Sequence, residues 1–303
     1  MKCGIVDVGS NTIRLSIYQW EGRQFKLLMN KKEMAGLAGY IRNGQLSDSG
    51  ILVACRVLAD FNALLDNFDI CDIHVFGTAS LRNITNTEEA LDTIEAVTGI
   101  RIEVLSGADE AAFSFLGATV GGGAPASGLL ADIGGGSTEL VAYTNGSITS
   151  GCSLPMGSLS LFTRHVSGLF PTREERRAIR AQVEAELEQA KTRGIHSSHL
   201  IGVGGTFRAA AKLCNDLSGA DSNNRLIPAD EVRGLYKRLK HGDQTALRQI
   251  LRSVPDRVHT ILPGLVILNA VLKHYEVENL CVSTCGVREG YLLQRVMGVN
   301  GHV

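Results

Sequence analysis

Two short segments of this chain share one residue pattern, and that pattern constrains the fold more than any other feature. The segments DVGSNTIRL (7–15) and DIGGGSTEL (132–140) align without a gap, and both begin with Asp-x-Gly. Each follows a run of apolar residues and leads into another, which is typical of a β-hairpin with a short glycine- or serine-rich loop. Two such hairpins predict a duplicated domain.

The loops of these hairpins have the composition of an anion-binding site. Glycine lacks Cβ, so backbone N–H groups can converge on an oxyanion, and Ser or Thr hydroxyls add donors. The second loop joins strand to strand and lacks the P-loop lysine, so it is neither a P-loop nor a dinucleotide-binding turn. A single copy is equally consistent with a tight turn, but two copies in one frame favour phosphate binding. The predicted donors are Ser10, Asn11 and Thr12 in the first loop, and Gly134, Gly135, Gly136 and Ser137 in the second.

The domain organisation follows from length and from one linker-like stretch. The 303 residues are about twice the commonest domain size, which favours two domains. The stretch GGGAPASG (121–128) precedes the second hairpin and has the composition of a linker. We therefore predict domains at 1–124 and 125–303, with the last helix packing back on the first domain. Expected strands lie at about 3–8, 13–19, 24–30, 72–76, 101–105, 128–133, 138–144, 147–153, 199–203 and 279–283, and expected helices at about 47–67, 86–98, 172–193, and from 106 and 286 onward.

Charge and cysteine usage exclude several classes of function. A formal net charge of -1 argues against overall attraction to nucleic acid or an anionic membrane, so any anion site must be local. The sequence has no apolar run of the ~18 residues that a membrane span needs. Its first residues do not resemble a signal peptide and its seven cysteines form no C-x-x-C pair, so a cytoplasmic location is expected. A catalytic cysteine is not expected, and the eight histidines lack the H-E-x-x-H spacing of a zinc hydrolase.

Seven segments, taken in order, resemble the motifs of one enzyme family, the exopolyphosphatase and guanosine pentaphosphate phosphohydrolase (Ppx/GppA) family. They are DVGSNTIRL, GTASLRN, SGADEAAFSFLG, DIGGGSTEL, GVGGTFRAAAKL, ILPGLVIL and CGVREGYL. The resemblance implies an α/β fold with two actin-like ATPase (ribonuclease H-like) domains of βββαβαβα order, which face each other across a cleft. Longer members carry an additional helical region, and this chain resembles the short two-domain form.

Three acidic residues receive catalytic roles. Glu110, in SGADEA, matches the family glutamate that acts as general base, although an acid in the first turn of a helix is otherwise commonplace. Asp132 and Glu139 bracket the second loop and are predicted to hold Mg²⁺, which prefers a few carboxylate oxygens with waters and substrate phosphate. Asp7 is the equivalent acid of the first loop. The alternative for each aspartate is that it only stabilises its own turn, and Mn²⁺ remains open as the metal.

Further substrate contacts are predicted from both halves of the chain. Arg82, in GTASLRN, matches a family arginine beside the cleft, and the guanidinium fork suits phosphate. Arg14 occupies the repeat position of Glu139, with a solvated arginine as the alternative. In LIGVGGTFRAAAKL (200–213), a strand leads into a helix. The predicted donors at that helix start are Gly204, Gly205 and Thr206, for which a tight turn is the alternative.

Two further segments of the sequence receive no catalytic assignment. Arg288 and Glu289 resemble the start of the family's closing helix and are expected to form a structural pair between the domains. Many relatives have an acidic residue in the stretch that here contains His259 and Thr260. This departure either weakens a contact to a metal or basic residue or has no effect.

Together these observations predict a hydrolase that removes the terminal phosphate of inorganic polyphosphate, with guanosine pentaphosphate (pppGpp) as a second substrate. The alternatives are a regulator that binds guanosine tetra- or pentaphosphate with little turnover, and a sugar-kinase-like ATPase of the same fold. Retention of Glu110, Asp132 and Glu139 favours turnover, and SGADEA and GTASLRN favour a phosphohydrolase. No nucleic-acid or membrane partner is expected, and a homodimer is open because many relatives dimerise.

Overall fold

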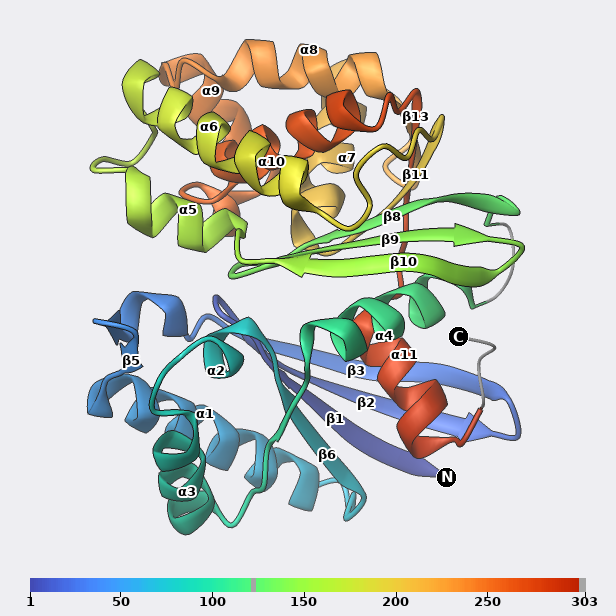
Figure 1. Ribbon diagram of the computed structural model, residues 1–303. Helices are drawn as coiled ribbons and strands as arrows, with labels where there is room; N and C mark the ends of the chain where they lie inside the picture. The colour runs from blue at the N-terminus through green and yellow to red at the C-terminus, as the bar shows by residue number, and fades with distance from the viewer. Residues whose placement is uncertain (121–123, 300–303) are drawn as a thin grey trace. The chain divides into compact units, whose positions relative to one another are not determined.

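A computed structural model describes residues 1–120 and 124–299, and its chain separates into two compact units (Figure 1). Unit 1 comprises residues 1–110 and the segment that begins at Tyr291, and unit 2 comprises residues 111–290. The predicted boundary after residue 124 lies further along the chain than this division. Residues 121–123, part of the predicted linker, lie outside the described residues.

The sheet of unit 1 has five strands in the order β3-β2-β1-β6-β7. The first three strands form an antiparallel meander, and β6 and β7 extend the sheet in parallel with β1. Alternate residues of β1, Val6 and Val8, are buried with Leu58 and Phe61 of helix α1, as the period of two in a strand requires. The strands are β1 (Lys2–Val8), β2 (Ile13–Glu21), β3 (Gln24–Glu33), β6 (Ile73–Gly77) and β7 (Glu103–Val104).

The helices of unit 1 begin and end at residues suited to those positions. Ser47 caps α1 by accepting the N–H of Gly50 at 3.4 Å, and Gly99 ends α3 in the left-handed conformation with φ of 69°. The remaining elements are α1 (Asp48–Asp66), α2 (Ala79–Arg82), α3 (Thr87–Thr98), the start of α4 (Gly107–Thr119), the 3-10 helix η1 (Leu37–Tyr40), and a small hairpin of β4 (Ile41–Arg42) and β5 (Gln45–Leu46).

The sheet of unit 2 repeats this topology. Its order is β10-β9-β8-β11-β13-β12, again with an antiparallel meander of three strands followed by strands parallel to the first. The added edge strand β12 is antiparallel to β13. The predicted duplication is therefore confirmed. The strands are β8 (Ser127–Ile133), β9 (Thr138–Thr144), β10 (Ser147–Leu154), β11 (His199–Val203), β12 (Leu226–Pro228) and β13 (Asn279–Val282).

Helices cover both faces of the second sheet. Leu129 and Ala131 of β8 face one large hydrophobic core, whereas Leu130 between them packs in a smaller cluster with Phe115 of α4. The large core is built with α6, α7, α8 and α10. The further elements are α5 (Ser158–His165), α6 (Arg173–Gln189), α7 (Gly205–Ser218), α8 (Ala229–Leu239), α9 (Gln244–Ser253), η2 (Pro255–Arg257), α10 (Ile261–His274) and α11 (Val287–Tyr291).

The C-terminal segment is held within unit 1 by Tyr291. Its ring packs on Phe76 with 4.9 Å between centroids, and its hydroxyl donates to Glu103 at 2.8 Å. Arg295, in the π-helical turn η3 (Leu292–Val296), forms an ion pair with the same Glu103 at 3.2 Å. Across residues 1–120 and 124–299, we find no helix with the length and apolar character that a membrane span requires.

Candidate active site

The first glycine-containing loop is closed and anchored by its own backbone. The N–H of Gly9 donates to the carbonyl of Thr12 at 3.1 Å, and the carbonyls of Ser10 and Asn11 accept from N–H groups in the segment 36–38, each at 2.9 Å. The N–H groups of Ser10, Asn11 and Thr12 donate to no acceptor in the described part of the chain. The loop thus fixes its carbonyls and leaves three amides available to an anion.

The second loop is closed by the equivalent hydrogen bond and is also anchored through two of its carbonyls. The N–H of Gly134 donates to the carbonyl of Ser137 at 3.0 Å. The carbonyls of Gly134 and Gly135 accept from the first N–H groups of α5 (158–160), each at 2.9 Å. Within residues 1–120 and 124–299, the N–H groups of Gly135, Gly136 and Ser137 have no acceptor. The repeat in the sequence is therefore a repeat in geometry, and both loops have the arrangement of a phosphate-binding turn.

Helix α5 supports the second loop, and the sequence did not predict this helix. Gly157, just before α5, lies so close to the loop that a Cβ there would be 2.4 Å from the carbonyl carbon of Gly135 and 2.5 Å from the nitrogen of Gly136. Both neighbours are backbone atoms and cannot rotate away. The run Pro-Met-Gly-Ser after a predicted strand is the one local signal for this contact.

Replacing Gly157 by alanine is expected to displace the second loop and lower turnover about 100-fold, because a shift of ~1 Å in a positioning group has this effect. The matched control is Gly234→Ala in α8, where a Cβ would meet nothing within 4 Å. The measurement is the turnover rate beside a thermal unfolding curve. Equal activity of the two variants would show that the loop does not depend on this contact.

The strand register sets the acidic side chains of the second hairpin beside one another. Asp132 on β8 is directly opposite Glu139 on β9, and Asp7 on β1 is directly opposite Arg14 on β2. Directly opposite residues of antiparallel strands lie on the same face with Cβ atoms ~5 Å apart. The second hairpin therefore pairs two carboxylates, while the first pairs a carboxylate with a guanidinium.

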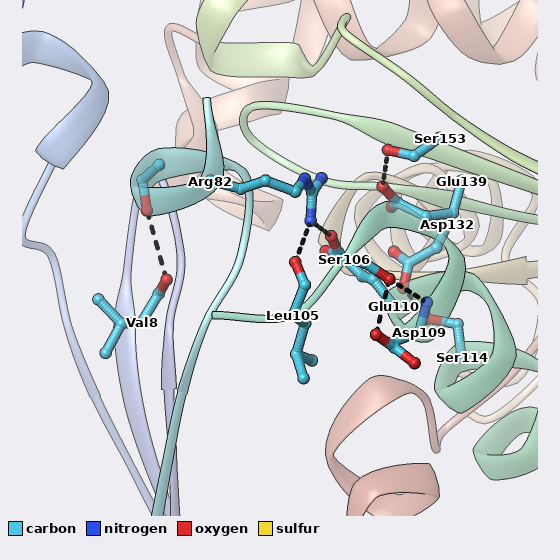
Figure 2. A network of polar contacts seen from close by, with 11 residues as sticks. Val8, Arg82, Leu105, Ser106, Asp109, Glu110, Ser114, Asp132, Glu139 and Ser153 are labelled. Carbon is cyan, nitrogen blue, oxygen red and sulfur yellow. Dashed lines mark hydrogen bonds and ion pairs between the residues drawn. The ribbon is translucent and has the colours of Figure 1, made fainter. Parts of the chain in front are cut away.

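Both carboxylates of the second hairpin have hydroxyl partners (Figure 2). Ser114 of α4 donates to Asp132 at 2.6 Å, and Ser153 of β10 donates to Glu139 at 2.8 Å. Glu139 is only 1% exposed. Burial raises the pKa of Asp132, and the Ser114 hydroxyl and then the charges of Arg208 and Arg288 oppose that rise. Neither serine was predicted from the sequence.

The carboxylates of Asp132 and Glu139 are oxygen donors of the kind that a magnesium ion prefers. No group of three or more His, Cys, Asp or Glu side chains that could hold a metal occurs in the part of the chain that the structure describes. Magnesium binds through one or two carboxylates and completes its shell with waters and substrate phosphate, and Asp132 and Glu139 supply that number. The partner of Asp7 in the register is Arg14, so the metal role of Asp7 stays a prediction.

In unit 1, Glu110 and Arg82 form a largely buried ion pair (Figure 2). Arg82, at the end of α2, donates from Nη1 to Glu110 Oε2 at 2.7 Å and to the carbonyl of Leu105 at 3.0 Å. Their side chains are 18% and 10% exposed. Ser106 caps α4 by accepting the N–H of Asp109 at 3.1 Å, which sets Glu110 in the first turn. Arg82 therefore orients the predicted base, and its predicted contact with substrate stays a prediction.

The glycines before α7 make room for charged side chains. Gly204 has φ of 92°, and a Cβ there would lie 2.6 Å from Oδ1 of Asp132. A Cβ on Gly205 would lie 1.7 Å from the Arg257 guanidinium. Thr206 is 2% exposed. Packing thus explains why these residues are small, and their role as phosphate donors stays a prediction.

Two arginines of unit 2, Arg208 and Arg288, lie near Asp132, and a third, Arg257, lies near Arg208. Burial and the charge of Arg288 lower the pKa of Arg208, while the charge of Asp132 opposes this and that of Arg257 adds to it. Glu289 accepts the N–H of Gly286 at 2.8 Å, which caps α11. Arg208 lies within the predicted motif GVGGTFRAAAKL, one helical turn after its glycines, so the motif contained the signal for it. No local pattern pointed to Arg257.

His259 and Thr260 supply no carboxylate to the site. The ring of His259 packs edge-on to Phe162 of α5 with 5.4 Å between centroids, and burial, with a smaller contribution from the charge of Arg257, lowers its pKa. Thr260 is 1% exposed, and its Oγ1 has no hydrogen-bond partner among the described residues. Neither side chain supplies a metal ligand of the kind that Mg²⁺ prefers.

Comparisons with known proteins agree over nearly the whole chain. The profile of the Ppx/GppA phosphatase family matches residues 16–297. Exopolyphosphatase 1 of Mycobacterium leprae is 24% identical over 308 residues, which is 98% of this chain and 90% of that protein. An exopolyphosphatase structure from Cytophaga hutchinsonii superposes with a TM-score of 0.87, at 24% identity over 100% of both chains. A Ppx/GppA family member from Aquifex aeolicus has a TM-score of 0.79, at 25% identity over 99% of both chains. The predicted actin-like α/β fold is confirmed.

Proposed function

Because this chain belongs to the Ppx/GppA phosphatase family, we propose that it is an exopolyphosphatase, which hydrolyses the terminal phosphoanhydride of inorganic polyphosphate and releases orthophosphate. The observation that carries the proposal is the pair of loops with anchored carbonyls and available N–H groups at 10–12 and 135–137. Relatives named exopolyphosphatase, similar along the whole chain, support it.

The loops suit the transition state of phosphoryl transfer. Most of the catalysis in this reaction comes from positioning the reactants and from stabilising charge on the equatorial oxygens of the transferred group. Backbone N–H groups fixed by a closed turn do this without having to reorganise during the reaction. In each unit, the N–H groups of the loop would therefore receive phosphate oxygens.

Glu110 is proposed to accept a proton from the attacking water. A general base must be held in a defined orientation within hydrogen-bond reach of the water. Arg82 supplies that orientation through its 2.7 Å contact with Oε2, and is itself fixed by the carbonyl of Leu105. The Glu110 carboxylate would take the proton as the water attacks the terminal phosphorus. Arg82 therefore affects the reaction by orienting the Glu110 carboxylate.

Asp132 and Glu139 are proposed to hold Mg²⁺, or Mn²⁺ with the same oxygen donors. A bound divalent cation would neutralise charge that develops on the phosphate oxygens. The Ser114 and Ser153 hydroxyls keep the two carboxylates oriented. The same terminal phosphoanhydride occurs in pppGpp, so we propose that nucleotide as a possible second substrate.

The test is orthophosphate release with Mg²⁺ from long-chain polyphosphate, short-chain polyphosphate and pppGpp in parallel. Release from polyphosphate is the expected result. Release from pppGpp alone would make the protein a nucleotide phosphohydrolase. Tight nucleotide binding without release from any of the three would contradict an enzyme and favour a regulatory protein.

A further inference from the structure

A groove on the helical face of unit 2 is lined mainly by basic side chains. Its lining residues come from α6, from α8 and the two residues after it, and from α10. Two adjoining cavities of about 550 and 290 Å³ make up this basic groove, and they share Arg180, Tyr236 and Lys240. Glu184 is the one carboxylate that lines either cavity.

The basic residues recur at helical spacing on facing surfaces. In α6, Arg173, Arg177 and Arg180 follow one face at intervals of three or four residues, and such residues are neighbours on a helix surface. Lys237 of α8 and Lys240 just after it repeat this arrangement on the opposite wall. The two walls therefore present cations to the same space.

Most of these cations have no anionic partner. Across the described residues, no ion pair or side-chain hydrogen bond involves Arg173, Arg177, Arg180, Lys237, Lys240 or Lys273. Two further basic residues of the groove do have partners, since Arg176 donates to the carbonyl of Pro171 at 2.7 Å and Arg233 pairs with Asp230 at 2.7 Å. Neighbouring like charges without partners repel one another, and a bound polyanion relieves that repulsion.

The distribution of charged residues along α6 also contributes to the positive charge of the groove. Arg173, Arg177 and Arg180 lie in its first half, and Glu184, Glu186 and Glu188 lie in its second half, which is the reverse of what the helix dipole favours. Glu174 and Glu175 do lie in the first turn, but Glu175 is committed to the cap with Thr172, and its pKa is lowered to about 2 by hydrogen bonds from Thr172 and Ser167. The first five residues of α6 contain three arginines and two glutamates and so carry one net positive charge, to which the helix dipole adds.

We propose that the basic groove binds a stretch of polyphosphate remote from the end that reacts, and this rests on the proposed function. The groove is separated from the second phosphate loop by α5. The N-terminus of α5 binds that loop, and its C-terminus leads through residues 166–172 to Arg173. Eight helical residues span ~12 Å. Only a polyphosphate chain longer than this helix would reach from the second loop to the groove.

Polyphosphate fits the groove better than nucleic acid does. Single-stranded nucleic acid is bound by aromatic platforms that stack on bases as well as by cations, and the groove contains one aromatic side chain, Tyr236, among its lining residues. A polymer that carries charge on every unit and has no bases needs only the cations. At the far end the groove meets Asp230, Glu276 and Glu278, which limits the stretch that a polyanion would occupy.

The test compares two triple variants with the same change in charge. The groove variant combines Arg177→Gln, Arg180→Gln and Lys240→Gln. The control combines Lys212→Gln, Arg248→Gln and Arg252→Gln, which are exposed residues of α7 and α9 that do not line the groove. For long-chain polyphosphate, the KM of the groove variant is expected to rise about 10-fold with unchanged kcat, since each lost charge contact weakens binding by a small factor. Both kinetic constants for short chains should stay at the wild-type values.

A binding measurement separates this proposal from the proposed function. Long-chain polyphosphate is titrated against both triples in a Glu110→Gln background at several salt concentrations. In the groove variant, the slope of log Kd against log salt concentration is expected to be smaller by about 2, because three phosphate contacts are lost. This expectation holds whether or not the protein hydrolyses polyphosphate. Equal slopes for groove and control variants would overturn the proposal. The proposal would also be overturned if a single-stranded RNA of equal charge bound more tightly than polyphosphate and if the groove variant lost that binding. The groove would then be a nucleic-acid site.

Discussion

Glu110→Gln is expected to lower orthophosphate release from polyphosphate by about 1,000-fold, within the range that general base catalysis contributes. Glutamine has the same shape and still offers an oxygen to the Arg82 guanidinium, so the contact that is 2.7 Å long in the wild type survives. It cannot accept a proton from water. Substrate binding should therefore stay close to that of the wild type while kcat falls.

Asp109→Asn is the matched control for this variant. Asp109 is the neighbouring acid in the same first turn of α4, and its carboxylate accepts from the hydroxyl of Ser106 at 2.6 Å. The control removes one negative charge at nearly the same place and is expected to reduce turnover less than about 3-fold, as most surface substitutions have small effects. Wild-type turnover in Glu110→Gln would exclude Glu110 as the base.

Glu139→Gln is expected to raise the Mg²⁺ concentration needed for half-maximal activity by about 10- to 100-fold, the size of effect that loss of a supporting metal contact produces. The substitution retains a side-chain oxygen that can accept from Ser153, whose hydroxyl lies 2.8 Å from the carboxylate in the wild type. The measurement is the initial rate against Mg²⁺ concentration at fixed polyphosphate, beside a thermal unfolding curve.

Glu231→Gln provides the comparison, because Glu231 is an exposed acid in the first turn of α8. Its Mg²⁺ dependence should match that of the wild type. If Glu139→Gln gives the same Mg²⁺ dependence as this control, Glu139 does not hold the metal, and Asp132 would have to do so without it.

The duplication of the hairpins could be predicted from the sequence because its signal is local. Asp-x-Gly after an apolar strand recurs at 7–15 and 132–140, and alternation within each strand identifies its buried face. The opposition of Asp132 and Glu139 follows from the hairpin register, since the short loop between the strands leaves little freedom in pairing. The sheet order and the two closed loops agree with these local signals.

Contacts between distant segments could not be predicted in the same way. Arg82 and Glu110 lie on separate elements, and only the fold brings them within 2.7 Å. The same holds for Ser114 with Asp132. Helix α5 was missed because it is eight residues long, too short for a clear helical period. Its role depends on Gly157, where only glycine fits because a Cβ would clash with the backbone of the second loop. That clash cannot be recognised until the position of the loop is known.

The most direct test of the proposed chemistry is hydrolysis of polyphosphate with Mg²⁺ in water labelled with heavy oxygen, followed by mass analysis of both products. Attack of water on the terminal phosphorus predicts one heavy oxygen atom in each orthophosphate released and none on the shortened chain. The same experiment with Glu110→Gln should give almost no labelled orthophosphate. A heavy oxygen on the shortened chain, or no orthophosphate at all, would contradict terminal hydrolysis by this protein.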